Sequence, residues 1–143
     1  MHKILLPVDG SESALRAVRH VIRQLEGQPD ARVTLLYVHQ VPVPYGAVGA
    51  RVGADEVKRL EREAADPVLA GAEELLRAAG VAYEREFRVA EDIAPMIARR
   101  ADELGVEAIV MGTHGGGVLA RMITGSTASK VLHLAKVPVT FVK

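Results

Sequence analysis

Three glycines in the last third of the chain are spaced like a loop that binds an anion. Gly112 ends a short apolar run, Gly115 follows it, and Gly125 directly precedes Ser126 and Thr127. Glycine lets backbone N–H groups approach a ligand closely, and the start of a helix favours phosphate. The last 36 residues contain no Asp or Glu. The segment therefore predicts a phosphate site, although a glycine-rich turn before a capped helix explains the same composition.

Two common nucleotide motifs do not fit this spacing. A P-loop requires a G-x4-G-K-[ST] run, and the sequence contains none. The glycines at 115 and 117 with Ala120 match G-x-G-x-x-A formally. No acidic residue follows them, however, and a dinucleotide site needs one for the ribose. Both motifs are excluded.

A carboxylate stands at the end of the first apolar run. Asp9 follows Pro7 and Val8, and it precedes Gly10 and Ser11. At the end of a central strand, such a carboxylate can accept hydrogen bonds from a ribose or hold a magnesium ion. The alternative is a turn that Asp-Gly-Ser builds by itself.

The hydrophobic pattern indicates the elements that position these residues. Short apolar runs, typical of buried strands, alternate with stretches of helical periodicity. The runs predict five strands, over residues 3–8, 32–38, 81–89, 108–111 and 137–142. The stretches between them predict four helices, so the element order is β-α-β-α-β-α-β-α-β.

Polar residues and glycines mark the ends of these helices. Ser11 is expected to cap the first helix, Asp92 the third, and Ser126 or Thr127 the fourth. Gly27 and Gly105 are expected to end the first and the third. The second helix covers 55–79, with a kink or break near Ala65–Asp66 because Pro67 falls inside it.

Strands that are separated by helices pair in parallel through right-handed crossovers. The expected fold is therefore an α/β, open doubly wound five-stranded parallel sheet with four helices, a Rossmann-like arrangement. In such sheets ligands bind outside the carboxyl ends of the strands. This rule brings Asp9 and the segment after Gly112 to the same edge.

Composition excludes several classes of function. The chain has 143 residues, expected to form one domain over 1–143, and a net charge of zero, so nothing attracts it to nucleic acid or membrane. It has no cysteine, which excludes disulfides, cysteine-zinc sites and a thiol nucleophile. No apolar stretch approaches a membrane span, and no targeting segment is evident, so a cytoplasmic location is expected.

The glycine spacing resembles a known family pattern. Gly112-x2-Gly115-x9-Gly125-Ser126 matches the G-x2-G-x9-G-[ST] pattern of the universal stress protein family, in its ATP-binding branch. The blocks KILLPVDGSESALRAV, VMGTHG, GSTASKVL and VPVTFVK are also similar to that family and occur in its order. The resemblance extends over the whole chain and implies a sheet of order 3-2-1-4-5.

The resemblance also implies a ligand and its contacts. ATP, accompanied by magnesium, would lie at the carboxyl edge, with Asp9 at the ribose and Val38 at the adenine. The other implied contacts are Pro7 and Val8 along the nucleotide, Gly112 at the approach of the chain, and Gly115, Gly125, Ser126 and Thr127 at the phosphates. His114 lies inside the motif and either donates to a phosphate or contributes only its backbone.

The sequence departs from the family pattern at two positions. Ala90 stands where members commonly carry glycine, and Gly116 stands where a basic or bulky residue is common. Family members often form homodimers by antiparallel pairing of the last strand, here 137–142, and this chain is expected to do the same.

Three functions remain open. The first is an ATP-binding regulatory module of the stress response that acts on an unknown protein partner. The second is a weak ATPase or phosphotransfer enzyme of the same fold. The third is a dimeric interaction protein with a vestigial site. No residues form a recognisable nucleophile, base and orienter, so no enzyme activity beyond slow ATP hydrolysis is assigned.

Overall fold

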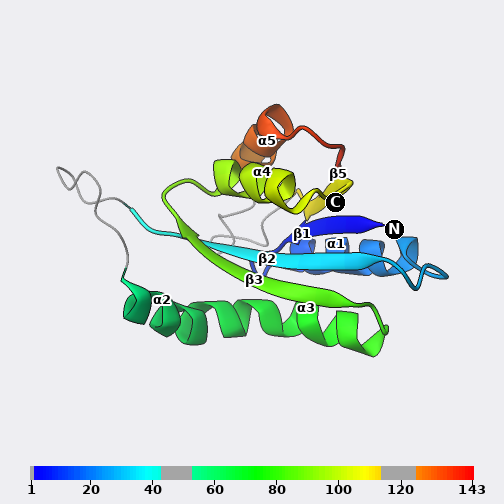
Figure 1. Ribbon diagram of the computed structural model, residues 1–143, viewed down its shortest axis with the longest axis horizontal. Coiled ribbons are helices and arrows are strands. Elements are labelled where there is room, and N and C mark those ends of the chain that lie inside the picture. The colour runs from blue at the N-terminus through cyan, green and yellow to red at the C-terminus, as the bar shows by residue number, and fades with distance from the viewer. Residues whose placement is uncertain (1, 43–52, 114–124) are drawn as a thin grey trace.

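The computed structural model describes residues 2–42, 53–113 and 125–143 and contains the expected sheet (Figure 1). All strand pairs are parallel, and their order is β3-β2-β1-β4-β5, as predicted. The strands are β1 Lys3–Pro7, β2 Arg32–Gln40, β3 Tyr83–Ala90, β4 Ala108–Gly112 and β5 Val139–Val142. The helices are α1 Glu12–Gln24, α2 Ala54–Leu60, η1 Glu61–Ala65, α3 Asp66–Ala78, α4 Ile93–Leu104 and α5 Gly125–Leu134.

Helices cover both faces of the sheet, which explains the uninterrupted apolar runs of the central strands. Successive side chains of a strand point to opposite faces. Leu6 therefore packs in the core beneath α1 and α3, and Leu5 packs in the core beneath α4 and α5. Both leucines are fully buried. Figure 1 shows the two helical layers on either side of the sheet.

The long second helix has an irregular turn close to where the sequence predicts a kink or break. Instead of breaking near Ala65–Asp66, the chain stays helical from α2 through α3 and passes through a five-residue π-helical turn, η1. The Asp66 N–H donates to the Glu61 carbonyl, five residues back. Because Pro67 has no N–H and would crowd the carbonyl four residues before it, a widened turn at this point accommodates the proline without breaking the helix.

The helix ends agree with the sequence only in part. Ser11 caps α1, since its side chain accepts a hydrogen bond from the Ala14 N–H at 3.1 Å. Gly105 ends α4 in the left-handed conformation, with φ of 64°. Asp92 occupies the cap position of α4, but its side chain makes no capping hydrogen bond. It lies instead 3.9 Å from the Lys130 ammonium group of α5, which is an alternative partner for the carboxylate.

The cap expected for the last helix is wrong, because neither Ser126 nor Thr127 precedes the helix. The helix already includes Gly125, so Ser126 and Thr127 lie within its first turn. Glycine has no Cβ and enters helical and extended conformations with similar ease, which allows α5 to begin before the hydroxyl residues. Across 2–42, 53–113 and 125–143, no helix is long and apolar enough to cross a membrane.

Candidate functional site

The carboxyl ends of the parallel strands meet at one edge of the sheet, on the left in Figure 1. A small hollow opens there between β1, β2 and α4. It is lined by Pro7, Val8, Asp9, Leu36, Val38, Ile93 and Ile97. The structure thus brings together four residues that the sequence analysis assigned to a nucleotide: Pro7, Val8, Asp9 and Val38.

Backbone pairing fixes this part of the site. The Val8 N–H donates to the Leu36 carbonyl at 2.9 Å, which continues the β1–β2 ladder one residue beyond β1. Val8 and Val38 are each only 3% exposed, so the hollow has an apolar wall on the sheet side. Asp9 is half-buried at the start of the following turn and adds a carboxylate to that wall.

Asp9 also builds the turn that leads into α1. Its Oδ1 accepts a hydrogen bond from the Ser11 N–H at 3.0 Å, and Gly10 has a φ of +84°. A positive φ of this size suits glycine and strains other residues. The turn-forming interpretation of Asp9 is confirmed, and its contact with a ribose or a magnesium ion stays a prediction.

The charge of Asp9 reaches the neighbouring strand. Burial first, and the negative charge of Asp9 second, raise the pKa of the Tyr37 hydroxyl above its ordinary value. Tyr37 packs in the core beneath α1 and α3, and its oxygen lies 2.9 Å from Nδ1 of His39. Val38 packs in the other core, so the tyrosine and the histidine lie on the side of the sheet away from the hollow.

Packing inside the protein explains why residue 112 is a glycine. A Cβ at this position would lie 2.3 Å from the Ser13 Oγ and 2.7 Å from the Ser13 backbone. Such distances are far below van der Waals contact, because Ser13 of α1 is 2% exposed and packs directly against the end of β4. Close packing of α1 on β4 therefore requires glycine here, independently of any ligand.

The first turn of α5 holds the other described residues of the glycine motif. Gly125 begins the helix, Ser126 is exposed and Thr127 is half-exposed. The first turn contains no acidic residue, so its N–H groups and the positive end of the helix dipole suit an anion. His114 and Gly115 lie outside the described residues.

No metal site is evident in the part of the chain that the structure describes. There, no group of three or more His, Cys, Asp or Glu side chains is close enough to hold an ion. Magnesium commonly binds proteins through one or two carboxylates together with substrate phosphates. Asp9 fits that pattern only as one ligand of an ion that a nucleotide brings with it.

Ile93 and Ile97 were not predicted as site residues. Both lie on the buried face of α4. Their place near the carboxyl edge could nevertheless be predicted from the order of strands and helices. They occupy the first two turns of the helix that follows β3, and that helix begins at the carboxyl edge.

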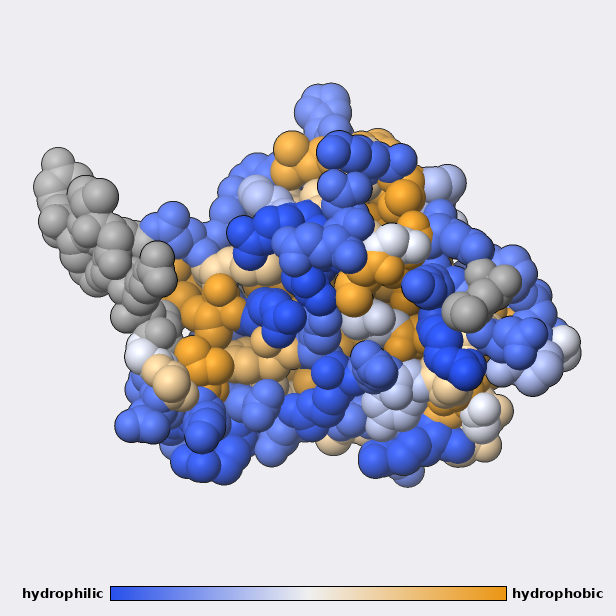
Figure 2. Space-filling model, viewed as in Figure 1, coloured by the Kyte–Doolittle hydropathy of each residue, from blue (hydrophilic) through white to orange (hydrophobic). Residues whose placement is uncertain are grey.

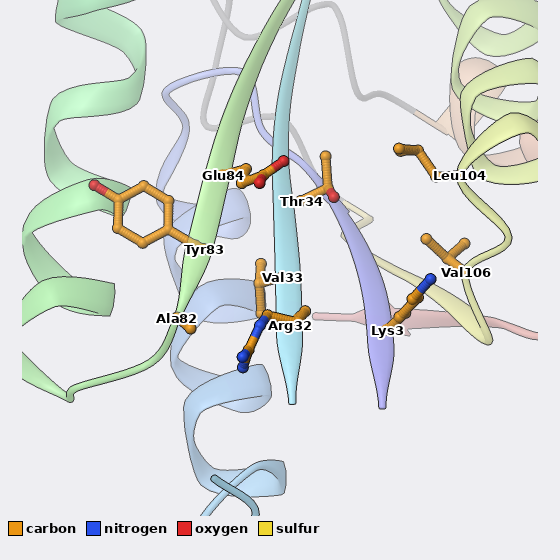
Figure 3. Close-up of a pocket in the computed structure, with 9 residues that line it drawn as sticks. All are labelled: Lys3, Arg32, Val33, Thr34, Ala82, Tyr83, Glu84, Leu104 and Val106. Carbon is orange, nitrogen blue, oxygen red and sulfur yellow. The ribbon is translucent and has the colours of Figure 1, made fainter. Parts of the chain in front are cut away.

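A larger hollow, of about 400 Å³, lies at the opposite end of the sheet. It is lined by residues near the amino ends of β1, β2 and β3, with Leu104 and Val106 closing one side (Figure 3). Its charged side chains are Lys3, Arg32 and Glu84. None of the predicted site residues contributes to it, and it lies away from the edge where doubly wound sheets bind ligands.

The sequence of the whole chain matches one family model. The model is that of the universal stress protein family, and it matches residues 1–143. The chain belongs to the universal stress protein family. It is 32% identical to universal stress protein MJ0531 of Methanocaldococcus jannaschii over 141 residues, which are 99% of this chain and 81% of that protein.

Solved structures of similar proteins share the fold. The hypothetical protein MJ0577 superimposes with a TM-score of 0.74 at 26% identity, covering 99% of this chain and 94% of the other. The universal stress protein of Archaeoglobus fulgidus in complex with dAMP gives a TM-score of 0.67 at 25% identity, covering 100% and 98%. The universal stress protein resemblance and the predicted sheet are both confirmed.

Proposed function

We propose that this universal stress protein binds an adenine nucleotide, with ATP as its ligand, at the carboxyl edge of the sheet. The observation that carries the proposal is the hollow in which Pro7, Val8, Asp9 and Val38 meet. The dAMP complex of the Archaeoglobus fulgidus relative supports an adenine nucleotide as the class of ligand.

The chemistry of the edge suits the three parts of a nucleotide. The buried side chain of Val38, in the core beneath α4 and α5, offers apolar contact to the base, and the carboxylate of Asp9 can accept hydrogen bonds from ribose hydroxyls. The first turn of α5, with Gly125, Ser126 and Thr127, contains no acidic residue, and the positive end of its helix dipole suits the phosphates. His114 and Gly115 belong to the same proposed phosphate site, which Gly112 leads into. Magnesium would be held between the phosphates and Asp9.

Isothermal titration with ATP and magnesium tests this proposal. Asp9→Ala should weaken binding by about tenfold to a hundredfold, the usual effect of losing a hydrogen bond to a charged group. Asp30→Ala is the matched control, because Asp30 is an exposed acid in the turn before β2, at the other end of the sheet. Absence of ATP binding by the unmodified protein would contradict the proposal. Equal losses of ATP affinity in the two variants would show that Asp9 does not contact the nucleotide.

We further propose that the nucleotide acts as a regulatory signal in a stress response and that the chain works as a homodimer. Mass spectrometry of the nucleotide after long incubation tests the first part, since a regulatory ligand remains intact while a substrate is converted. The second part follows from β5, an edge strand without a charged side chain, to which a second copy can add in antiparallel fashion. Sedimentation equilibrium tests it, and a monomer at all concentrations would contradict it.

A further inference from the structure

The hollow at the carboxyl edge is closed from one side by α4. Ile93 and Ile97 are four residues apart on this helix, so they share a face, and they are 5% and 1% exposed. Opposite them lie Leu36 and Val38 of β2, which pack in the same core as the two isoleucines. The space that remains is about 10 Å³, room for about one water molecule. A purine base is many times larger, so these side chains keep it out of the hollow.

Of the two isoleucines, Ile93 is the one that a base would meet first. It is the first residue of α4, which begins at the carboxyl edge directly after β3 and runs back toward the amino ends of the strands. Ile97 lies one helical turn deeper. Ile93 therefore stands at the mouth of the hollow, across from Val38, to which the base is assigned.

We propose that Ile93 determines the specificity of the base site, because its side chain stops the base at the mouth of the hollow. The proposal rests on the nucleotide binding proposed above. With the ribose at Asp9, the edge of adenine that carries N9 faces the aspartate. The opposite edge, which carries N6, faces away from Asp9 and toward Ile93. Groups attached to N6 should then collide with Ile93, whereas groups attached to C8, on the ribose side, should not.

Binding of enlarged ATP analogues tests this arrangement. The unmodified protein should bind N6-benzyl-ATP less tightly than ATP by about tenfold or more, the range that a few methylene groups decide in an apolar pocket. Ile93→Ala, which removes three carbon atoms at the mouth, should reduce this preference by about tenfold. The relative affinity for 8-bromo-ATP should not change. Ile93→Val should act in the same direction with a smaller effect, and it preserves the test if the alanine variant does not fold.

The matched control is Leu104→Ala. Leu104 lies in the last turn of the same helix, is partly buried, and lines the hollow at the other end of the sheet. This substitution removes the same number of carbon atoms, so it reports on general loosening of α4, and the preference for ATP over N6-benzyl-ATP should stay as in the unmodified protein.

Three results would overturn the proposal, and each can be told from the others. An unchanged preference in folded, ATP-binding Ile93 variants would show that Ile93 does not limit the base. An equal change in Leu104→Ala would assign the effect to the helix as a whole. Failure of the unmodified protein to bind ATP would overturn the proposed function, and the inference about Ile93 with it.

Discussion

The two edge strands of the sheet are built in opposite ways. β3 is eight residues long and carries Glu84, Arg85, Glu86 and Arg88. β5 is four residues long, and its sequence VTFV contains no charged residue. An exposed edge presents unpaired backbone groups to other chains, and charged side chains are a common means of keeping such chains away. The difference therefore bears on where a second copy can attach.

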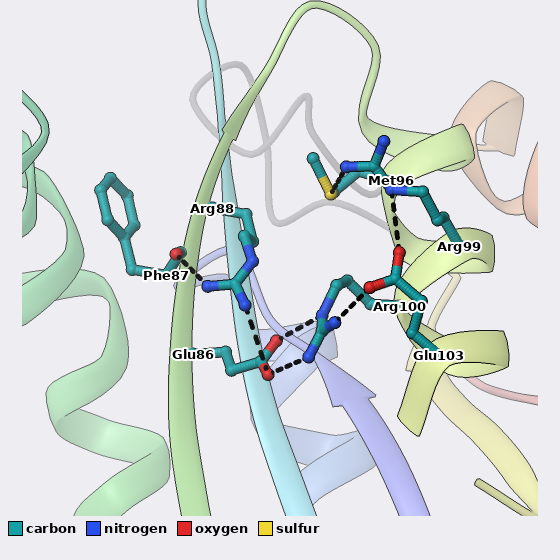
Figure 4. A network of polar contacts seen from close by, with 7 residues as sticks. All are labelled: Glu86, Phe87, Arg88, Met96, Arg99, Arg100 and Glu103. Atoms are coloured by element: carbon teal, nitrogen blue, oxygen red, sulfur yellow. Dashed lines mark hydrogen bonds and ion pairs between the residues drawn. The ribbon is translucent and has the colours of Figure 1, made fainter. Parts of the chain in front are cut away.

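Ion pairs connect β3 to the helices on both faces of the sheet. Toward α3, the Arg85 guanidinium lies 2.6 Å from Asp66 and 3.4 Å from Glu73. Toward α4, Arg100 donates to both carboxylate oxygens of Glu86, with its Nε 2.9 Å from Oε2 (Figure 4). The charged side chains of β3, which discourage pairing with another strand, are therefore held by ion pairs with α3 and α4.

β5 depends on backbone contacts with its inner neighbour. The Ile109 N–H donates to the Pro138 carbonyl at 2.9 Å, and the Thr113 N–H donates to the Val142 carbonyl at 3.1 Å. Beyond the strand, Arg16 of α1 donates to the Lys143 carbonyl at 3.0 Å. These bonds hold the inner side of β5, and among the strands that the structure describes none pairs with its outer edge.

The contrast is one of charge: β3 carries four charged residues that oppose pairing with another strand, and β5 carries none. Because β5 is short, it provides only a few backbone hydrogen bonds, so a dimer also needs apolar side chains. Leu132 and Leu134 of the adjacent α5 are 59% and 48% exposed. Figure 2 shows apolar surface near α5 at the top of the view, among hydrophilic side chains.

The largest expected effect on stability comes from comparing two glycines that pack against α1, one in β4 and one in α3. Gly112 pairs with Val142 of β5 and has no room for a Cβ. Gly112→Ala should lower the free energy of unfolding by about 2–3 kcal/mol through overpacking. Gly71 of α3, on the β3 side, would place its Cβ an ordinary 3.5 Å from Leu15. Gly71→Ala should raise that free energy by about 0.5–1 kcal/mol, the helix propensity gain.

Urea unfolding of both variants measures the difference. Equal stability of the two variants would show that α1 shifts easily away from Gly112. The β5 side would then be no more tightly packed than the β3 side.

The second prediction tests the ion pairs of β3. The side chains of Arg100 and Glu86 are 13% and 16% exposed, so Arg100→Ala leaves a mostly buried carboxylate with only Arg88, at 3.7 Å, as a charged partner. The free energy of unfolding should fall by about 2 kcal/mol. Arg99→Ala is the control, because the Arg99 side chain is 63% exposed and its pair with Glu103 is worth about 0.5 kcal/mol or less. Thermal unfolding that ranks the two variants equally would contradict this assignment.

The third prediction exchanges the character of the edges. Thr140 is an exposed residue of β5, so Thr140→Lys adds a charge to the edge where a second copy is proposed to pair. Dimerisation should weaken by about tenfold or more, equivalent to at least about 1.4 kcal/mol. Glu84→Lys changes an exposed residue of β3 and should leave the dimer intact. Sedimentation equilibrium measures the dimerisation of both variants. A greater loss of dimer with Glu84→Lys would place the interface at β3 and contradict the prediction.

Most of the fold could be predicted because its signals are local. The apolar runs, the cap at Ser11 and the left-handed Gly105 each depend on a few neighbouring residues. The sequence placed the proline effect correctly near Pro67, but of the two predicted forms, a kink or a break, the break is wrong. Whether a helix breaks or widens into a π turn depends on which side chains it keeps in the core, and here Leu60 and Ala65 both stay against it.

The site could be predicted less completely, because it depends on contacts between distant segments. The rule for doubly wound sheets correctly placed Asp9 at the carboxyl edge, and Val38, which the family resemblance implied, lines the same hollow. It gave no sign that Ser13 occupies the space beside Gly112, since helix and strand meet only in the folded chain. Ile93 was missed for a similar reason, because an apolar residue in a buried helix face has no distinguishing mark in the sequence.

The smallest expected effect is a pH dependence that belongs to the β3 edge. The Tyr83 hydroxyl donates to Glu73 of α3 at 3.1 Å. Burial first, and then this hydrogen bond and the charge of Glu73, raise the pKa of Tyr83 above its ordinary value of 10.0. The folded chain therefore keeps the tyrosine neutral when the unfolded chain already ionises it. The stabilisation is complete below about pH 10 and is lost as the pH rises through the pKa of the folded state.

Urea unfolding at several pH values around pH 10 measures this contribution. The free energy of unfolding should fall less with rising pH in Tyr83→Phe than in the unmodified protein, and the difference should be less than about 1 kcal/mol. Tyr37→Phe is the comparison, because the pKa of Tyr37 is also raised, although its hydroxyl contacts His39 rather than an acid of α3. An unchanged pH dependence in Tyr83→Phe would mean that the β3 edge opens before the tyrosine ionises. The bracing of this edge by α3 would then be weaker than its ion pairs suggest.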